Sequence, residues 1–411
     1  MRYNTATLPC GLRIIHLPSA SPVVYCGYQI AAGTRHEQPG EEGLAHFCEH
    51  VTFKGTRRRT ALQVINALEG VGGELNAFTN KEDTTFYAAV MKAHLGQAID
   101  LLTDIVFQSQ YPQAEIDKEV EVICDEIESY NDSPAELIYD EFENLIFSGH
   151  PLGHNILGSA ERLRTYTTAD ALRFTRRYYR PDNAIFFAYG DLDFGKLLKS
   201  LEKAILLSPL PPTAPISAVT ATVPTIPAAP QLTLRQLSTH QAHVMMGTQA
   251  YNVHHPHRVA LYLLNNILGG PGLNSRLNLL LREKHGLVYT VESTMVSYSD
   301  TGVWAVYFGC DPHDEARCRR LVRHELDKLM RRPLSRTALA TAKQQIKGQL
   351  AIACDSREQF ALDFGKSFLH YGWEKDLDNL FQNIDAVTAE EIYGVANELF
   401  RADRMATLIF K

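Results

Sequence analysis

The chain has 411 residues, more than a single compact core usually holds, so two domains are the expected organisation. Hydrophobic residues make up 45% of the chain and charged residues 21%, which is ordinary for a soluble globular protein. The formal net charge is −7 and no long basic run is present, which argues against nucleic acid or an anionic membrane surface as a partner.

The N-terminus and the cysteines indicate the compartment. The N-terminus lacks a basic start followed by an apolar core, and no stretch approaches the roughly 20 apolar residues of a membrane span, so we expect neither a secretory signal nor a membrane partner. The seven cysteines are scattered and form no CxxC pair. Such a set is typical of free thiols in a reducing compartment, and we predict a cytoplasmic protein.

The first segment that carries chemistry is residues 43–56, GLAHFCEHVTFKGT, which place His46, Glu49 and His50 within five positions. A helix turns by about 100° per residue, so these three side chains share one face. Two imidazoles at this spacing can bind one zinc ion, and the glutamate beside them can act as general base on a water that the metal acidifies. Cys48 points away from that face and is expected to pack. The alternative is a solvated helix face rich in histidine.

A catalytic zinc needs a third protein ligand, and residues 114–134, AEIDKEVEVICDEIESYNDSP, supply the candidate. Their apolar residues recur at helical spacing. Glu119 and Glu126 lie two turns apart beside this apolar stripe, where two carboxylates need a cation to neutralise them. We predict Glu126 as the third ligand and Glu119 as a carboxylate that orients a ligand, with pairing of Glu119 to a nearby arginine as the alternative.

Two other stretches are rich in histidine. The segment HPLGHN, residues 150–155, reads as a plain loop, with contact to substrate as the alternative. The segment HHPH, residues 254–257, contains Pro256, which breaks any helical ligand face. We therefore expect a loop there, ahead of a helix with the sequence RVALYLLNNIL.

The two halves of the chain resemble each other. Residues 168–190 and 388–411 each read as a helix capped by a threonine (Thr168 and Thr388), a turn and an apolar strand. Upstream, each half also has a helix ending in glycine, a second helix (ALQVINAL or SRLNLLLREKH), and a glycine that opens a pair of strands. The nearly constant offset indicates a duplicated unit. Short turns between strands and clustered helices favour an α+β two-layer sandwich.

Residues 208–231 separate these halves, and they contain seven of the 19 prolines and no charged residue. Such a stretch cannot be a helix interior and is most simply an extended linker. The sequence thus predicts an N-terminal zinc-binding domain at 1–207, a Pro/Ala-rich linker at 208–231 and a homologous C-terminal domain at 232–411.

At this point the sequence resembles the pitrilysin/insulinase-type zinc peptidases, whose motif is inverted relative to that of other zinc peptidases. In size it is most similar to the short-chain members, such as mitochondrial processing peptidase subunits and their bacterial relatives. The segment GLAHFCEHVTFKGT resembles the zinc helix of the family, and the spacing from His50 to Glu126 matches the family's third ligand. The segment GGELNAFTNKEDTTFYAAV resembles the strand along which substrates lie, with Asn76 and Ala77 at the contact positions.

The C-terminal half carries two further resemblances. The segment LGGPGLNSRL is similar to the glycine-rich loop of the family, and LREKHGLVY to its Arg–Tyr pair, here Arg282 and Tyr289. The resemblance implies that Tyr289 stabilises the oxyanion and that Arg282 holds the substrate backbone. No HxxEH motif occurs in this half, so the family pattern implies one zinc ion per chain.

The resemblance also implies an architecture and an activity. Two homologous domains would form a half-shell, and a homodimer would close the chamber that larger relatives build from four such domains. Arg282 and Tyr289 of one chain would then face the zinc helix of the other. The implied activity is a zinc metalloendopeptidase that hydrolyses short or unfolded peptides.

Three other functions remain open. The family includes non-catalytic subunits that have lost zinc ligands, but here all three ligands and Glu49 are present. A heterodimer would divide the zinc motif and the Arg–Tyr pair between two chains, whereas this chain has both, which favours a homodimer. A zinc-binding or peptide-carrier protein without hydrolysis would lack the general base.

Overall fold

The computed structural model describes residues 2–208, 231–237 and 239–411, so the predicted linker at 208–231 lies outside the described residues except for its two ends. The chain forms two compact units. Unit 1 comprises Met1–Ser129, His154–Thr220 and Ala353–Asp376, and unit 2 comprises Tyr130–Gly153, Ala221–Ile352 and Leu377–Lys411. Unlike the predicted domains, these units are not contiguous in sequence, because each takes a segment from the other half of the chain.

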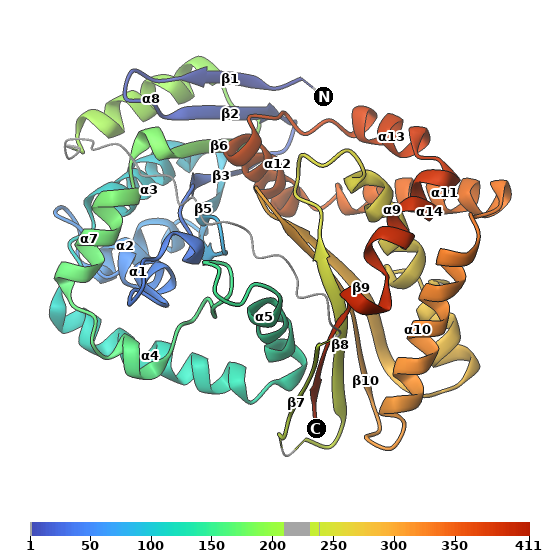
Figure 1. Cartoon of the computed structure of the whole chain (residues 1–411). Helices are drawn as coiled ribbons and strands as arrows, with labels where there is room; N and C mark the ends of the chain where they lie inside the picture. The colour runs from blue at the N-terminus through green and yellow to red at the C-terminus, as the bar shows by residue number, and fades with distance from the viewer. Residues whose placement is uncertain (1, 209–230, 238) are drawn as a thin grey trace. The chain divides into compact units, whose positions relative to one another are not determined.

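Unit 1 is built on a six-stranded sheet in the order β1-β2-β6-β3-β5-β4 (Figure 1). Strands β2 and β6 are parallel, and the other neighbours are antiparallel. Strand β4 is an edge strand, so one side of its backbone has no strand partner in the described part of the chain. The strand bounds are β1 (Asn4–Thr7), β2 (Arg13–Pro18), β3 (Val23–Ile30), β4 (Glu74–Thr79), β5 (Thr84–Met91) and β6 (Ala184–Gly190).

Both faces of this sheet are covered by helices. Each strand contributes side chains to both faces, because successive side chains of a strand point to opposite sides. On one face Tyr28 and Phe86 join the main core, which is closed by helices of the N-terminal half. On the other face Phe187 and Tyr87 pack against α12 (Arg357–Tyr371). The other helices of unit 1 are α1 (Leu44–Thr52), α2 (Ala61–Glu69), α3 (Leu95–Gln108), α4 (Gln113–Asn131), α6 (Ala160–Leu163), α7 (Thr168–Tyr178) and α8 (Phe194–Leu206).

Unit 2 repeats this plan with a five-stranded sheet in the order β7-β11-β8-β10-β9. Its strands are β7 (Gln231–Arg235), β8 (Ala242–Ala250), β9 (Val288–Ser297), β10 (Gly302–Cys310) and β11 (Ala406–Phe410). One face packs on helices of the C-terminal half, and the other face packs on α5 (Pro134–Ile146) from the N-terminal half. The other helices are α9 (Arg258–Gly269), α10 (Glu315–Arg331), α11 (Arg336–Ala353), α13 (Leu377–Ala386) and α14 (Ala389–Leu399).

The strand orders confirm the predicted duplication and the α+β class. Strands β2-β6-β3-β5-β4 and β7-β11-β8-β10-β9 occupy equivalent places, and in each unit only the β2–β6 or β7–β11 pair is parallel. The two units have exchanged equivalent helices, since α5 covers the second sheet and α12 covers the first. Burial of an apolar helix face does not depend on which half of the chain supplies the helix.

Two local predictions need correction. Thr168 was expected to cap a helix, but the cap is Thr167, because its capping box requires an acid three residues later and Asp170 holds that place. In the second half Thr388 caps α14 as predicted. The predicted helix SRLNLLLREKH contains a π-helical stretch, Asn278–Lys284. No helix in the described part of the chain has the length and apolar character needed to cross a membrane.

Helix α12 should contribute to the stability of unit 1, and this contribution can be measured. Phe364 is fully buried and contacts the rings of Tyr3, Phe187 and Tyr189. We expect Phe364→Ala to lower the free energy of unfolding of unit 1 by about 3–5 kcal/mol, the usual range for a buried phenylalanine. Urea unfolding followed by Trp373 fluorescence in a Trp304→Phe background would measure this. Gln359→Ala, at an exposed position of the same helix, should change it by less than about 0.5 kcal/mol. Equal effects of the two changes would contradict the account.

Candidate metal centre

Helix α1 presents its two histidines because its other face is buried. Phe47, Cys48 and Val51 are fully buried in the core of unit 1, which confirms that Cys48 packs. The helical repeat then turns His46 and His50 away from the core, one turn apart. Their ring centroids are 4.6 Å apart.

Helix α4 brings the third predicted ligand to the same place. Its apolar stripe is buried in the same core, as predicted, and Glu126 lies beside it. One carboxylate oxygen of Glu126 is 3.9 Å from Nε2 of His46, and the other is 3.4 Å from Nε2 of His50. The three ligand atoms lie within 4.8 Å of one another. Residues almost 80 positions apart along the chain therefore form one cluster, and the 44% exposed side chain of Glu126 leaves it open to solvent.

This donor set fits a zinc ion. Zinc ligands lie about 2.0–2.2 Å from the metal, which puts tetrahedral ligand atoms roughly 3.3 Å apart. The observed separations, 3.4 and 3.9 Å to the two oxygens of Glu126 and at most 4.8 Å among the three ligand atoms, would have to contract through side-chain rotation to reach that value. Two imidazole nitrogens and one carboxylate oxygen are the three protein ligands of several catalytic zinc sites. In the described part of the chain, no other group of three potential ligands converges in this way.

Glu119 lies behind the cluster, against the second nitrogen of His50. Its Oε1 is 3.1 Å from Nδ1 of His50, so the carboxylate can fix that ring with its Nε2 toward Glu126. Its other oxygen is 2.5 Å from Nζ of Lys54. The cation that pairs with Glu119 is therefore a lysine and not the arginine considered as the alternative. Lys54 lies four positions after His50 in the turn that follows α1, so helical spacing alone did not predict this contact.

The charges of the cluster shift the pKa values of its histidines in opposite directions. Burial and, to a smaller extent, the neighbouring His50 lower the pKa of His46 to about 4, against the raising effect of Glu126. Burial also lowers the pKa of His50, but hydrogen bonds to Glu119 and Glu126 outweigh it and raise that pKa to about 9. Two carboxylates thus favour a positive charge at the point where a metal ion would be bound.

Glu49 is buried beside the ligands, and one side chain donates a hydrogen bond to its carboxylate. Oγ1 of Thr79, the last residue of β4, donates to its Oε2 at 3.0 Å. Burial raises the pKa of Glu49 to about 7, against the lowering effects of His50 and Thr79. A pKa near neutrality suits a group that both accepts and returns a proton. Thr79 was not predicted, because its role depends on the packing of β4 against α1.

The predicted substrate contacts in unit 1 lie on the edge strand. Asn76 is exposed and Ala77 half-buried, and both belong to β4. Among the strands that the structure describes, β4 pairs only with β5. The same strand ends at Thr79, so the unpaired edge and the donor to Glu49 belong to one element. An extended peptide could add to this edge by backbone hydrogen bonds.

The predicted Arg–Tyr pair belongs to unit 2. Cζ of Arg282 lies 5.2 Å from the ring centroid of Tyr289, a cation–π contact. Tyr289 is 79% exposed at the start of β9, which leaves its hydroxyl free to meet another molecule. Their role at the metal cluster stays a prediction.

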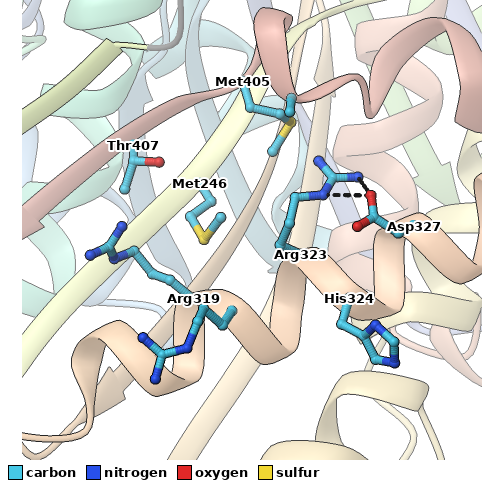
Figure 2. Close-up of a pocket in the computed structure, with 9 residues that line it drawn as sticks. Met246, Arg319, Arg323, His324, Asp327, Met405 and Thr407 are labelled. Carbon is cyan, nitrogen blue, oxygen red and sulfur yellow. Dashed lines mark hydrogen bonds and ion pairs between the residues drawn. The ribbon is translucent and has the colours of Figure 1, made fainter.

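The remaining histidine-rich loop and a surface pocket do not offer comparable chemistry. Residues 254–257 form the loop before α9, as predicted. Figure 2 shows a pocket in unit 2, with a volume of about 450 Å³, beside α10 and lined by Met246, Met405 and several basic residues. Arg323 there donates to Asp327 and to the carbonyl of Phe400, and Arg319 pairs with Glu315. The charges of Arg319 and Arg323 are therefore already paired within the protein.

Comparison with known protein families gives a separate match for each half of the chain. Residues 14–160 match the family described as "Insulinase (Peptidase family M16)", and residues 165–346 match "Peptidase M16 inactive domain". An uncharacterized zinc protease of Bacillus subtilis (strain 168) is 32% identical over 401 residues, covering 97% of this chain and 96% of the relative. The chain belongs to the insulinase family of peptidases, M16.

Similarity to other known proteins also extends over nearly the whole chain. An uncharacterized zinc protease of Streptomyces coelicolor is 34% identical over 399 residues, 96% of this chain and 86% of the relative. A crystal structure of a protease from Helicobacter pylori superposes with a TM-score of 0.93 at 23% identity, covering 100% of this chain and 99% of that one. The family resemblance and the fold class predicted from the sequence are thus confirmed, and the metal cluster lies in the half that matches the insulinase description.

Proposed function

We propose that this M16 chain is a zinc metalloendopeptidase that hydrolyses short or unfolded peptides, with zinc held by His46, His50 and Glu126. The observation that carries the proposal is the convergence of these three side chains from α1 and α4, with Glu49 buried beside them. The names of the zinc-protease relatives support the same metal. The free cysteines are consistent with a cytoplasmic location, which we include in the proposal.

The chain's own residues would divide the reaction as follows. A zinc ion, when bound, supplies Lewis acidity that acidifies water and polarises the peptide carbonyl. Glu49, oriented by Thr79, accepts the proton of the attacking water and passes it to the leaving amine. Glu119 holds the ring of His50, and Lys54 balances the charge of that carboxylate.

The substrate would bind as an additional strand on β4. Asn76 and Ala77 would contact it mainly through backbone hydrogen bonds, so that the peptide backbone is recognised more than its side chains. Addition at this edge places the peptide along the strand that ends at Thr79, the donor to Glu49. Tyr289 would stabilise the developing oxyanion, and Arg282 would hold the substrate backbone.

A non-catalytic subunit is the second candidate, since one of the matched family descriptions is that of an inactive domain. That description covers residues 165–346, which exclude the metal cluster. The presence of all three ligands and of a buried general base therefore supports an enzyme.

Replacement of the general base tests the proposed chemistry. We expect Glu49→Gln to bind zinc as the wild type does but to lower kcat for a quenched-fluorescence peptide by about 10²–10⁴-fold, because the proton acceptor is lost. Glu115→Gln, which alters a half-buried carboxylate on α4 paired with Lys118, should leave kcat unchanged. Undiminished turnover by Glu49→Gln with full zinc content would show that the base is a different group.

We also propose a homodimer in which Arg282 and Tyr289 of one chain complete the site of the other. Inactive His46→Ala and inactive Tyr289→Phe should then restore activity when mixed, to about a quarter of the wild-type value, because half of the dimers are mixed and each has one intact site. Peptide cleavage and zinc content would be measured together. A mixture that stays inactive, while wild type cleaves, would place the pair and the zinc within one chain's site or require a different partner chain.

A further inference from the structure

Helix α1, which carries both histidine ligands, cannot cap its own N-terminus. Its first flanking residue is Gly43, in a left-handed conformation with φ 83°, and glycine has no side chain to accept a hydrogen bond. A Cβ at this position would lie 2.8 Å from the carbonyl oxygen of Leu157 and from Cα of Gly158. The close approach of the 157–158 loop therefore requires glycine, and the free N–H groups of the helix need an acceptor from elsewhere.

Glu37 supplies that acceptor from outside the helix. Its Oε1 accepts a hydrogen bond from the backbone N–H of Ala45 at 2.7 Å, and its Oε2 accepts one from Gly43 at 3.1 Å. The side chain of Glu37 is only 1% exposed. A carboxylate at this end of a helix also interacts favourably with the helix dipole.

His154 holds this carboxylate in place. Nε2 of His154 lies 2.8 Å from Oε2 of Glu37, and Lys81 donates to the carbonyl of His154. Burial raises the pKa of Glu37 to about 7, while the hydrogen bond from His154 lowers it and so favours the charged form. His154 belongs to the HPLGHN segment, which the sequence left without a function beyond a loop or a substrate contact.

The two metal-binding histidines differ in what fixes their rings. His50 has Glu119 on its Nδ1. Nδ1 of His46 is buried and has no hydrogen-bond partner among the described residues. The ring of His46 therefore depends on the backbone of the first turn of α1, and Ala45, the residue directly before it, is one of the two that Glu37 binds.

We propose that Glu37, held by His154, positions His46 for metal binding by anchoring the first turn of α1. Glu37 does for His46 indirectly what Glu119 does for His50 by direct contact. The inference rests on the proposed zinc site. Neither Glu37 nor His154 touches the reacting groups, so both are positioning residues.

Zinc affinity, measured by competition with a chromogenic chelator, tests this. We expect Glu37→Gln to weaken zinc binding about tenfold, the lower end of the range for groups that orient metal ligands, because its amide can accept from Ala45 but not from Gly43. His154→Leu should weaken it to a smaller extent, and His154→Gln, which retains a donor, should restore most of the affinity. Circular dichroism would verify that each variant is folded, and if Glu37→Gln does not fold, the two His154 variants decide.

A matched pair elsewhere in unit 1 separates positioning from general stability. Asp83 is a buried carboxylate whose Oδ1 lies 3.2 Å from Nε2 of His370, but it binds no part of α1. His370→Leu should leave zinc affinity unchanged even if it lowers stability. Equal zinc affinity in wild type and folded Glu37→Gln or His154→Leu, or an equal loss in His370→Leu, would overturn the inference. Absence of zinc binding by the wild type itself would instead overturn the proposed metal site and this inference with it.

Discussion

The convergence of two carboxylates on a pair of histidines is the constraint on which the rest of unit 1 depends. Glu119 and Glu126 lie within 3.1 and 3.4 Å of opposite nitrogens of the His50 ring. Both carboxylates favour positive charge at this ring, as the raised pKa of His50 shows, and Lys54 adds a further cation on the Glu119 side. A divalent cation held by the histidines and Glu126 would take the place of the proton on His50, so the electrostatics and the donor set favour the same kind of ligand.

The fold holds this arrangement by burying one face of each of the two helices in a single core. Helices α1 and α4 bury their apolar stripes in the same core, which sets the distance between the ligand-bearing faces. Strand β4, at the edge of that sheet, ends at Thr79, which donates to Glu49. The edge proposed to bind peptide and the proposed general base are therefore connected through one strand. The duplicated unit keeps the sheet but has no such cluster among its described residues.

The sequence predicted the structural features that depend on local periodicity. The faces of the helices that carry His46, His50 and Glu126 follow from the helical repeat, and duplication was visible from recurring caps and glycines. The exchange of α5 and α12 was not predictable, because an amphipathic pattern shows that a helix buries one face but not which sheet it covers. The contact from Thr79 was missed for a related reason, since it joins segments that meet only in the folded chain.

Anomalous diffraction from zinc-loaded crystals, recorded on both sides of the zinc absorption edge, would test the central claim most directly. The account predicts one anomalous peak per chain, within bonding distance of Nε2 of His46, Nε2 of His50 and the carboxylate of Glu126, with room for a water. A peak confined to another part of the chain, such as the loop at 254–257, or no peak at this cluster in zinc-saturated protein, would contradict it.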